Sequence, residues 1–287
     1  MDYTTTDGYV VDALGRRQLA NRDLLNGIRG TDARCDDLQN VVNTLMDLIE
    51  GAGLSGDASD DTLVVRAIRR IAGYSAPAWT TISSSTVLTV PAWATRMEIW
   101  LTGAGGGGCG CQAAGDSQSY SGAGGAAGAT AHFTATVTGG AVVNFIIGAP
   151  GDGGVSSGGS PGNGGASTVS VAGVLIATAQ GGQGGRWAGI SSSAGGIGGG
   201  VTFSDGLIDT GMFGGGDGGD GQASVKQLSG NGGTSYWGGG GRAGALGGLP
   251  ATAPGAGGGG AYDVNYTENS YNGGAGALGL AMVRFLP

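Results

Sequence analysis

The stretch Arg96-Met-Glu-Ile-Trp-Leu-Thr-Gly-Ala-Gly-Gly-Gly-Gly108 joins two sequence patterns within a few residues. Its first half alternates, with Met97, Ile99 and Leu101 on one face, which predicts a β-strand with one buried face. Its second half is almost pure glycine, which has no side chain to pack. The stretch therefore predicts a β domain whose strands lead into glycine-rich segments.

Glycine is concentrated in the second part of the chain. Of 68 glycines in 287 residues, 8 lie in residues 1–102 and 60 in residues 103–287. Ordering 60 glycines costs on the order of tens of kcal/mol relative to alanine, more than the roughly 5–15 kcal/mol net stability of a domain. Glycine offers in return a close approach of backbones, which can hydrogen-bond laterally in the threefold extended conformation of polyproline II. We therefore expect polyglycine-II-like segments with a core made of backbone.

Apolar runs between the glycines predict further strands, and irregular glycine spacing with only 7 prolines excludes collagen. The runs also argue against a disordered tail. They are Thr86–Pro91, Ala131–Val137, Val142–Ile147, Val169–Ile176 and Leu280–Leu286. We expect the first and last strands to pair in one antiparallel sheet, so that the fold class is mainly β.

A seven-residue repeat from Leu24 to Ile49 is typical of a coiled coil. The expected oligomer core is Leu24, Ile28, Cys35, Leu38, Val42, Leu45 and Ile49, with Thr31 at the remaining core position. The alternative is an amphipathic helix packed on its own domain; sparse apolar sequence nearby favours self-association. The repeat is compatible with two strands or three.

A second helix is expected at Leu63–Ile71, after a break at Gly51–Gly56 and an acidic start at Ser59–Thr62. It places Val64, Ala67, Ile68 and Ile71 on one face. The opening Gly8–Gly15 is consistent with a short hairpin or an extended arm. We divide the chain into a docking arm at 1–22, a helical oligomerisation stem at 23–73 and a glycine-rich β domain at 79–287.

Five motifs, in order, resemble the glycine-rich domain at the C-termini of tailed-bacteriophage tail fibres and related adhesins. They are Thr86–Gly108, Val143–Gly154, Gly165–Val169, Ala179–Gly185 and Gly273–Phe285. The resemblance covers roughly residues 79–287 and does not extend to the N-terminal part. It implies a homotrimeric fibre in the virion, made in the host cytoplasm. It further implies attachment to tail or baseplate proteins through the N-terminal arm and binding of a bacterial surface polysaccharide or outer-membrane protein through the C-terminal domain.

Aromatic residues among the glycines are suited to flat apolar or sugar surfaces. The receptor-contact candidates are Trp187, Tyr236, Trp237, Tyr262, Tyr266 and Tyr271. The alternative for each of these residues is packing between glycine layers or against a neighbouring chain. The packing interpretation is favoured for Phe203 and Phe213, because their side chains lack a polar group. A purely structural collar or baseplate fibre without receptor binding is the alternative function.

The sequence carries no constellation typical of an enzyme or a cofactor site. His132, the only histidine, lies in an alternating strand and is expected to be structural, and no zinc-type cysteine spacing occurs. Asp217 and Asp220 sit among glycines as calcium ligands do, yet one pair is too few, so solvated turn residues are favoured. Cys109-Gly-Cys111 is expected to hold free thiols in an exposed loop, with bridges to another chain as the alternative.

Charge and hydropathy exclude two classes of partner. The net charge is −8 without any basic stripe, which excludes binding to a nucleic acid backbone. No run of 18 apolar residues occurs, so no membrane insertion is expected.

Overall fold

The computed structural model describes residues 9–11, 17–19, 35–56, 60, 62–71, 77–114, 118–156, 159–187, 192–222, 229–264 and 269–287. The chain divides into two units, Met1–Ala76 and Pro77–Pro287. In the first unit, β1 (Tyr9–Val11) pairs antiparallel with β2 (Arg17–Leu19), so the hairpin alternative for the N-terminal arm holds.

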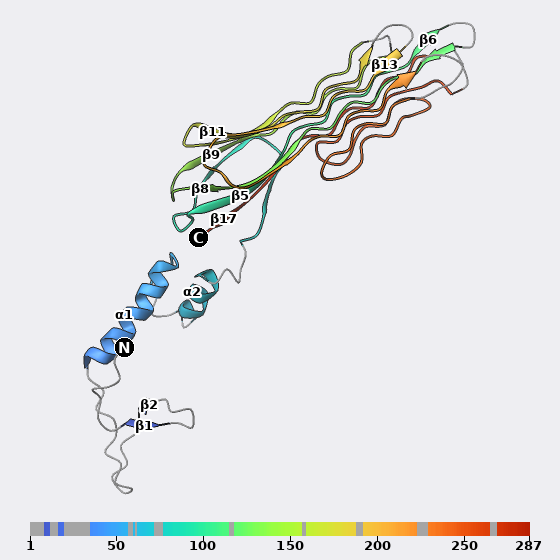
Figure 1. Cartoon of the computed structure of the whole chain (residues 1–287). Helices are drawn as coiled ribbons and strands as arrows, with labels where there is room; N and C mark the ends of the chain where they lie inside the picture. The colour runs from blue at the N-terminus through green and yellow to red at the C-terminus, as the bar shows by residue number, and fades with distance from the viewer. Residues whose placement is uncertain are drawn as a thin grey trace. The chain divides into compact units, whose positions relative to one another are not determined.

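Two helices, α1 (Cys35–Gly51) and α2 (Leu63–Ile71), pack against each other in the first unit (Figure 1). Their shared core contains Ile49, Ala52, Leu63 and Ala67. Ile49, expected in the oligomer core, is thus covered by α2, because the second helix supplies the apolar partner that the sequence pattern lacked. Val42 and Leu45 remain 51% and 39% exposed. Leu24 and Ile28, and the side chains of Cys35 and Leu38, lie outside the described residues.

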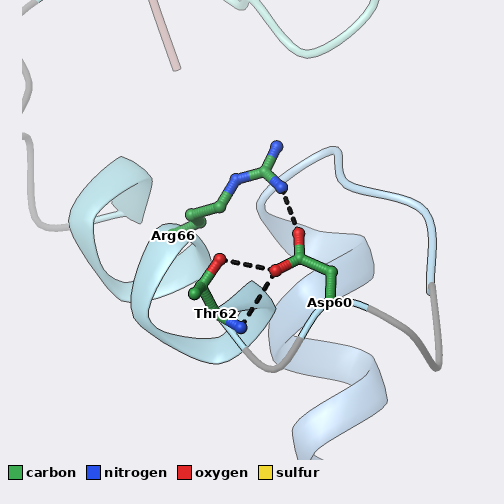
Figure 2. A network of polar contacts seen from close by, with 3 residues as sticks. All are labelled: Asp60, Thr62 and Arg66. Carbon is green, nitrogen blue, oxygen red and sulfur yellow. Dashed lines mark hydrogen bonds and ion pairs between the residues drawn. The ribbon is translucent and has the colours of Figure 1, made fainter.

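The start of α2 is fixed by Asp60, which precedes the helix (Figure 2). Its Oδ1 accepts hydrogen bonds from the Thr62 backbone N–H at 2.9 Å and the Thr62 hydroxyl at 2.5 Å, and its Oδ2 pairs with Arg66 at 2.5 Å. The hydrogen bonds from Thr62, helped by the bond and charge of Arg66, lower the pKa of Asp60. The acidic start expected from the sequence is therefore a cap in front of the first turn. Ile68 and Ile71, expected on the packing face, are 50% and 52% exposed.

The second unit is built on two five-stranded antiparallel sheets (Figure 1). The first sheet has the order β15 (Ile208–Phe213), β8 (Thr130–Thr136), β5 (Arg96–Thr102), β17 (Leu280–Leu286) and β3 (Thr80–Ile82). The second has the order β14 (Val201–Phe203), β11 (Val174–Ala179), β10 (Ser167–Val171), β9 (Val142–Ile146) and β4 (Thr86–Thr89). The last strand, β17, pairs with β5, with Leu101 opposite Ala281 and Ile99 opposite Val283. The first strand expected from the sequence does not join this sheet, because Thr86–Thr89 pairs with β9 in the second sheet.

The inner faces of the two sheets enclose one apolar core. Met97, Ile99, Leu101 and Phe133 are fully buried in it, and Phe145 enters from the second sheet. The alternation read from Arg96 to Leu101 is confirmed by these burial values. The core is therefore an ordinary side-chain interior between two layers.

One apolar run is two strands instead of one. Val169–Ile176 contains the turn Ala172–Gly173, where φ is +49° and +81°, and β10 pairs with β11 across it. The positive φ of Gly173 suits a hairpin turn, which the continuous apolar pattern concealed.

Glycine-rich segments extend from one end of the two sheets and are joined at their far end by short strands (Figure 1). These are the hairpin of β6 (Gln112–Ala114) with β7 (Gln118–Tyr120), and a three-stranded sheet of β12 (Arg186–Trp187), β13 (Ser192–Ala194) and β16 (Gly221–Gln222).

Candidate functional site

The segment 103–109 forms hydrogen bonds that repeat every third residue. The backbone N–H groups of Gly103, Gly106 and Cys109 donate to the carbonyls of Ala129, Ala126 and Ala123 in one segment. The N–H groups of residues 104 and 107 donate to the carbonyls of residues 165 and 162 in a second segment. Those of residues 105 and 108 donate to the carbonyls of residues 277 and 274 in a third. Its carbonyls accept from three other segments, through residues 182 and 185, 151 and 154, and 258 and 261. Segment 103–109 therefore has six neighbours, the arrangement expected of polyglycine-II-like packing.

Segments 122–129 and 255–261 are surrounded in the same way, and these three inner segments hydrogen-bond to one another. Among the described residues, nine outer segments encircle them in chain order, each bonded to the next, and the last bonds to the first. The outer segments are 148–154, 159–165, 180–185, 195–200, 214–220, 229–234, 240–244, 248–251 and 272–278. We call this arrangement of three inner and nine outer segments the glycine lattice.

The spacing of the lattice excludes side chains at most of its glycines. A Cβ at Gly105 would lie 1.9 Å from the Ala256 carbonyl oxygen, and a Cβ at Gly107 would lie 1.9 Å from that of Asp152. Both obstacles are backbone atoms, which have no rotamer by which to move away. The glycines are therefore required by close approach, as the composition predicted.

Polar side chains complete hydrogen bonds at the outer surface of the lattice. Asp217 Oδ1 accepts from the Gly198 N–H at 2.8 Å, and Asp220 Oδ1 accepts from the Gly195 N–H at 2.7 Å. Asn163, Asn231 and Asn272 accept backbone N–H groups in the same way, from Gly184, Ala243 and Ser156. The two aspartates therefore bond to the neighbouring segment, and the described residues contain no group of three or more His, Cys, Asp or Glu side chains placed to hold a metal ion.

Three of the six receptor-contact candidates, Trp187, Tyr262 and Tyr271, belong to connections at the far end of the lattice. Trp187 lies in β12, and its side chain lies outside the described residues. Tyr262 and Tyr271 are half-buried and flank the connection between segments 255–261 and 272–278; Tyr266, between them in sequence, lies outside the described residues. Tyr271 exchanges backbone hydrogen bonds with Cys111.

Tyr236 and Trp237 lie instead at the sheet end of the lattice, in an aromatic cluster. Trp100 stacks on His132 at 4.2 Å and on Tyr236 at 4.9 Å between ring centroids. Phe213 packs 4.8 Å from Tyr236, and the Trp237 indole N–H donates to the Thr102 hydroxyl at 2.8 Å. Tyr236 is 49% exposed and Phe213 39% exposed, so the cluster is open to solvent on one side.

Trp100 is not among the residues that the sequence singles out, and its neighbours in this cluster have separate predicted roles. The outward position of Trp100 on β5, opposite His132 on β8, was the available signal. What places Tyr236 over the same face is the turn between segments 229–234 and 240–244, which no local pattern predicts. Tyr236 and Trp237 therefore pack against other residues of the same chain, so packing is part of their role.

A charged group adjoins the aromatic cluster and explains His132. His132 Nε2 lies 2.9 Å from Glu98 Oε1. Arg284, on β17, donates a hydrogen bond to Glu98 Oε2, and its guanidinium group lies over the Trp79 ring. Burial alone raises the pKa of Glu98, but the hydrogen bonds and charges of His132 and Arg284 outweigh it, so this pKa lies below its ordinary value. His132 holds neighbouring strands together, which agrees with a structural role.

The two cysteines of the glycine-rich region are buried, which corrects the expectation of an exposed loop. Cys109 ends inner segment 103–109, and Cys111 lies two residues further along the chain; both are free thiols and fully buried. Burial raises the pKa of each to about 11. Both therefore stay protonated at neutral pH and are poor nucleophiles.

The glycine-rich domain family matches residues 80–286, from the start of β3 to the end of β17, and the chain belongs to that family. Among curated proteins, none matches the chain. Neither helix in the described part of the chain has the length and apolarity that a membrane span requires.

Proposed function

We propose that this chain is a tail-fibre or other virion appendage protein of a tailed bacteriophage that binds the bacterial surface without catalysis. Its N-terminal part attaches to the particle and its glycine-rich domain contacts a surface polysaccharide or an outer-membrane protein. The observation that carries the proposal is the glycine lattice, which presents connecting loops at one far end. The family match and the aromatic content of those loops add support.

A stiff support favours binding at its far end. Each inner segment has six hydrogen-bonded neighbours, so the roots of the far-end connections are held by the whole lattice. Tyr262 and Tyr271 lie directly at such roots, and both residues are only half-buried. Aromatic side chains on a rigid base lose little entropy when they contact a flat surface.

Oligomerisation through the helices forms the second part of the proposal. Apolar side chains remain exposed on both helices: Val41, Val42, Leu45 and Met46 on α1, and Val65, Ile68 and Ile71 on α2. An exposed apolar helix face of this kind favours self-association. The trimeric state follows from the resemblance to tail fibres.

Cell binding tests the receptor role. Fluorescently labelled full-length chain is titrated onto a panel of bacterial strains, and we expect saturable binding to at least one strain. The variant Tyr262→Ser/Tyr271→Ser should bind at least tenfold more weakly, whereas Thr168→Ser on β10 should bind normally. Absence of binding to any strain, with incorporation into particles intact, would favour the structural collar or baseplate fibre.

Sedimentation tests the stem. Leu45→Asp should convert the oligomer into a monomer, because it places a charge on the exposed apolar face of α1. Asp47→Asn, on the same helix, serves as the control. An unchanged sedimenting mass for Leu45→Asp would reject self-association through α1.

A further inference from the structure

Between outer segments 214–220 and 229–234 the lattice surface is hollowed into an open groove of about 470 Å³. Asp217, Asp220, Asn231 and Thr234 line it, together with Ser229 and glycines of both segments. The two segments that line the groove also bond to each other, because the N–H groups of Gly216 and Gly219 donate to the carbonyls of Thr234 and Asn231. It therefore lies where one more neighbour of both segments would stand.

The threefold repeat defines which backbone groups face this groove from segment 229–234. The N–H groups of Gly230 and Gly233 donate to inner segment 122–129, and that of Gly232 donates to Gly241 on the opposite side. The third class of residue, Asn231 and Thr234, lines the groove. Their N–H groups have no backbone acceptor among the described residues.

The same reasoning places acceptors on the other wall. In segment 214–220 the carbonyls of Gly216 and Gly219 accept from the inner segment, and the N–H groups of Gly215 and Gly218 donate to segment 195–200. The lattice geometry turns the carbonyls of Asp217 and Asp220 toward the groove, and within the described chain neither accepts a backbone hydrogen bond. One wall thus offers donors and the other acceptors, both at intervals of three residues.

The polar side chains on both walls of this groove bond to segments on its flanks and do not bridge the groove itself. Asp217 and Asp220 reach away from it to segment 195–200, and Asn231 reaches away to Ala243. Their bonds complete the outer surface beside the groove on both flanks. Asn163 does the same between segments 159–165 and 180–185. Among the described residues, no segment occupies this position of the lattice, and the backbone groups that face it have no backbone partner.

We propose that this groove binds an extended polypeptide strand of another protein, held in the polyproline II conformation as one more strand of the lattice. Such a strand repeats every three residues with a rise of about 3.1 Å per residue, which matches the spacing of both walls. Its carbonyls accept from Asn231 and Thr234, and its N–H groups donate to the carbonyls of Asp217 and Asp220. This inference is independent of the proposed function.

The groove specifies the chemistry of the strand. One residue in three must keep its backbone N–H and stay small, because it faces two backbones; proline is allowed at the others, whose N–H groups are not needed. The Asp217 and Asp220 carboxylates beside the groove favour a strand with Lys or Arg. The chain itself has a net charge of −8 and its glycine-rich segments already occupy the lattice, so a basic partner protein suits the groove better than a second copy.

The test uses the full chain and a fluorescent peptide of three Pro-Pro-Gly repeats with one lysine at each end. This peptide is too short for a stable triple helix and keeps one N–H per three residues. We expect saturable binding in fluorescence anisotropy. The matched peptide with N-methylglycine in place of glycine lacks those N–H groups and should bind at least tenfold more weakly. No binding of the first peptide, or equal binding of both, would overturn the proposal.

Two protein variants locate the binding. Thr234→Pro removes one groove donor and fills its place with the ring, while the carbonyl that accepts from Gly216 remains; we expect at least a tenfold loss of peptide affinity. Thr234→Ala keeps the N–H and should bind as the unaltered chain does. Retained binding by Thr234→Pro with an unchanged melting profile would overturn the assignment to this groove. Should that variant fail to fold, the comparison of the two peptides still decides.

Discussion

The two sheets and the glycine lattice exclude water from their interiors by opposite means. In the sheets, Phe133, Phe145 and Met97 fill the space between two backbones, and all three are fully buried. In the lattice, segment 103–109 is equally buried, but its surroundings are the backbones of six other segments. A side-chain interior needs volume at each position, whereas a backbone interior needs its absence.

The difference predicts opposite responses to a change in side-chain size. Removing atoms leaves a cavity in the sheets, where surrounding side chains collapse only partly. Adding one methyl group in the lattice forces two backbones apart. Because hydrogen bonds between these backbones repeat along the whole segment, the separation also disturbs the neighbouring bonds. Three measurements sharpen this comparison.

The largest effect is expected for Phe133→Ala. The ring is fully buried between the sheets and packs edge-on against Phe203 at 5.4 Å between centroids. We expect a loss of about 3–5 kcal/mol in the free energy of unfolding. Chemical denaturation followed by tryptophan fluorescence measures it. A loss below about 1 kcal/mol would show that the side-chain core does not support the sheets.

A smaller but still large loss is expected for Gly105→Ala, about 2–3 kcal/mol, from overpacking against the Ala256 carbonyl oxygen. The matched control is Gly239→Ala, since a Cβ at Gly239 meets nothing within 4 Å. That control should change the free energy of unfolding by at most about 0.5 kcal/mol. Equal effects at both positions would contradict the account of close backbone approach.

The smallest effect concerns the charged group on the outer face of the first sheet. The pKa of Glu98 lies below its ordinary value of 4.5 in the folded chain. Between the lowered pKa and pH 4.5, the unfolded chain therefore binds more protons than the folded chain. The contribution of Glu98 to the free energy of unfolding is complete above pH 4.5 and is lost as the pH falls through the lowered pKa.

Glu98→Gln should accordingly lower stability at pH 7 and flatten its dependence on pH below 4.5. Denaturation of the second unit, followed at a series of pH values, measures both effects. Glu50→Gln, in α1 of the other unit, is the control. A variant with the same pH dependence as the unaltered chain would remove Glu98 from the account.

Local patterns predicted individual strands better than their connections. The alternation through Ile99 and the final run ending at Phe285 predicted two strands, because a half-buried strand leaves a period of two in its own sequence. The turn at Gly173 was missed, since a hairpin with apolar flanks reads as one continuous run. The exposure of Cys109 was also misjudged, because glycine-rich sequence resembles a loop when its neighbours are unknown.

The sequence by itself determined that the second part of the chain is mainly β and that a helical region precedes it. It also determined that the cost of ordering the glycines is offset only by close contact between backbones. These follow from composition and period, which are local properties. Only the tertiary structure decided that, in the described part of the chain, three inner segments lie within nine outer ones, that Tyr236 joins Trp100, and that a groove lies beside Thr234. The physical reason is that glycine carries no side chain to specify a partner, so the neighbours of each segment are defined by hydrogen bonds between residues far apart in the chain.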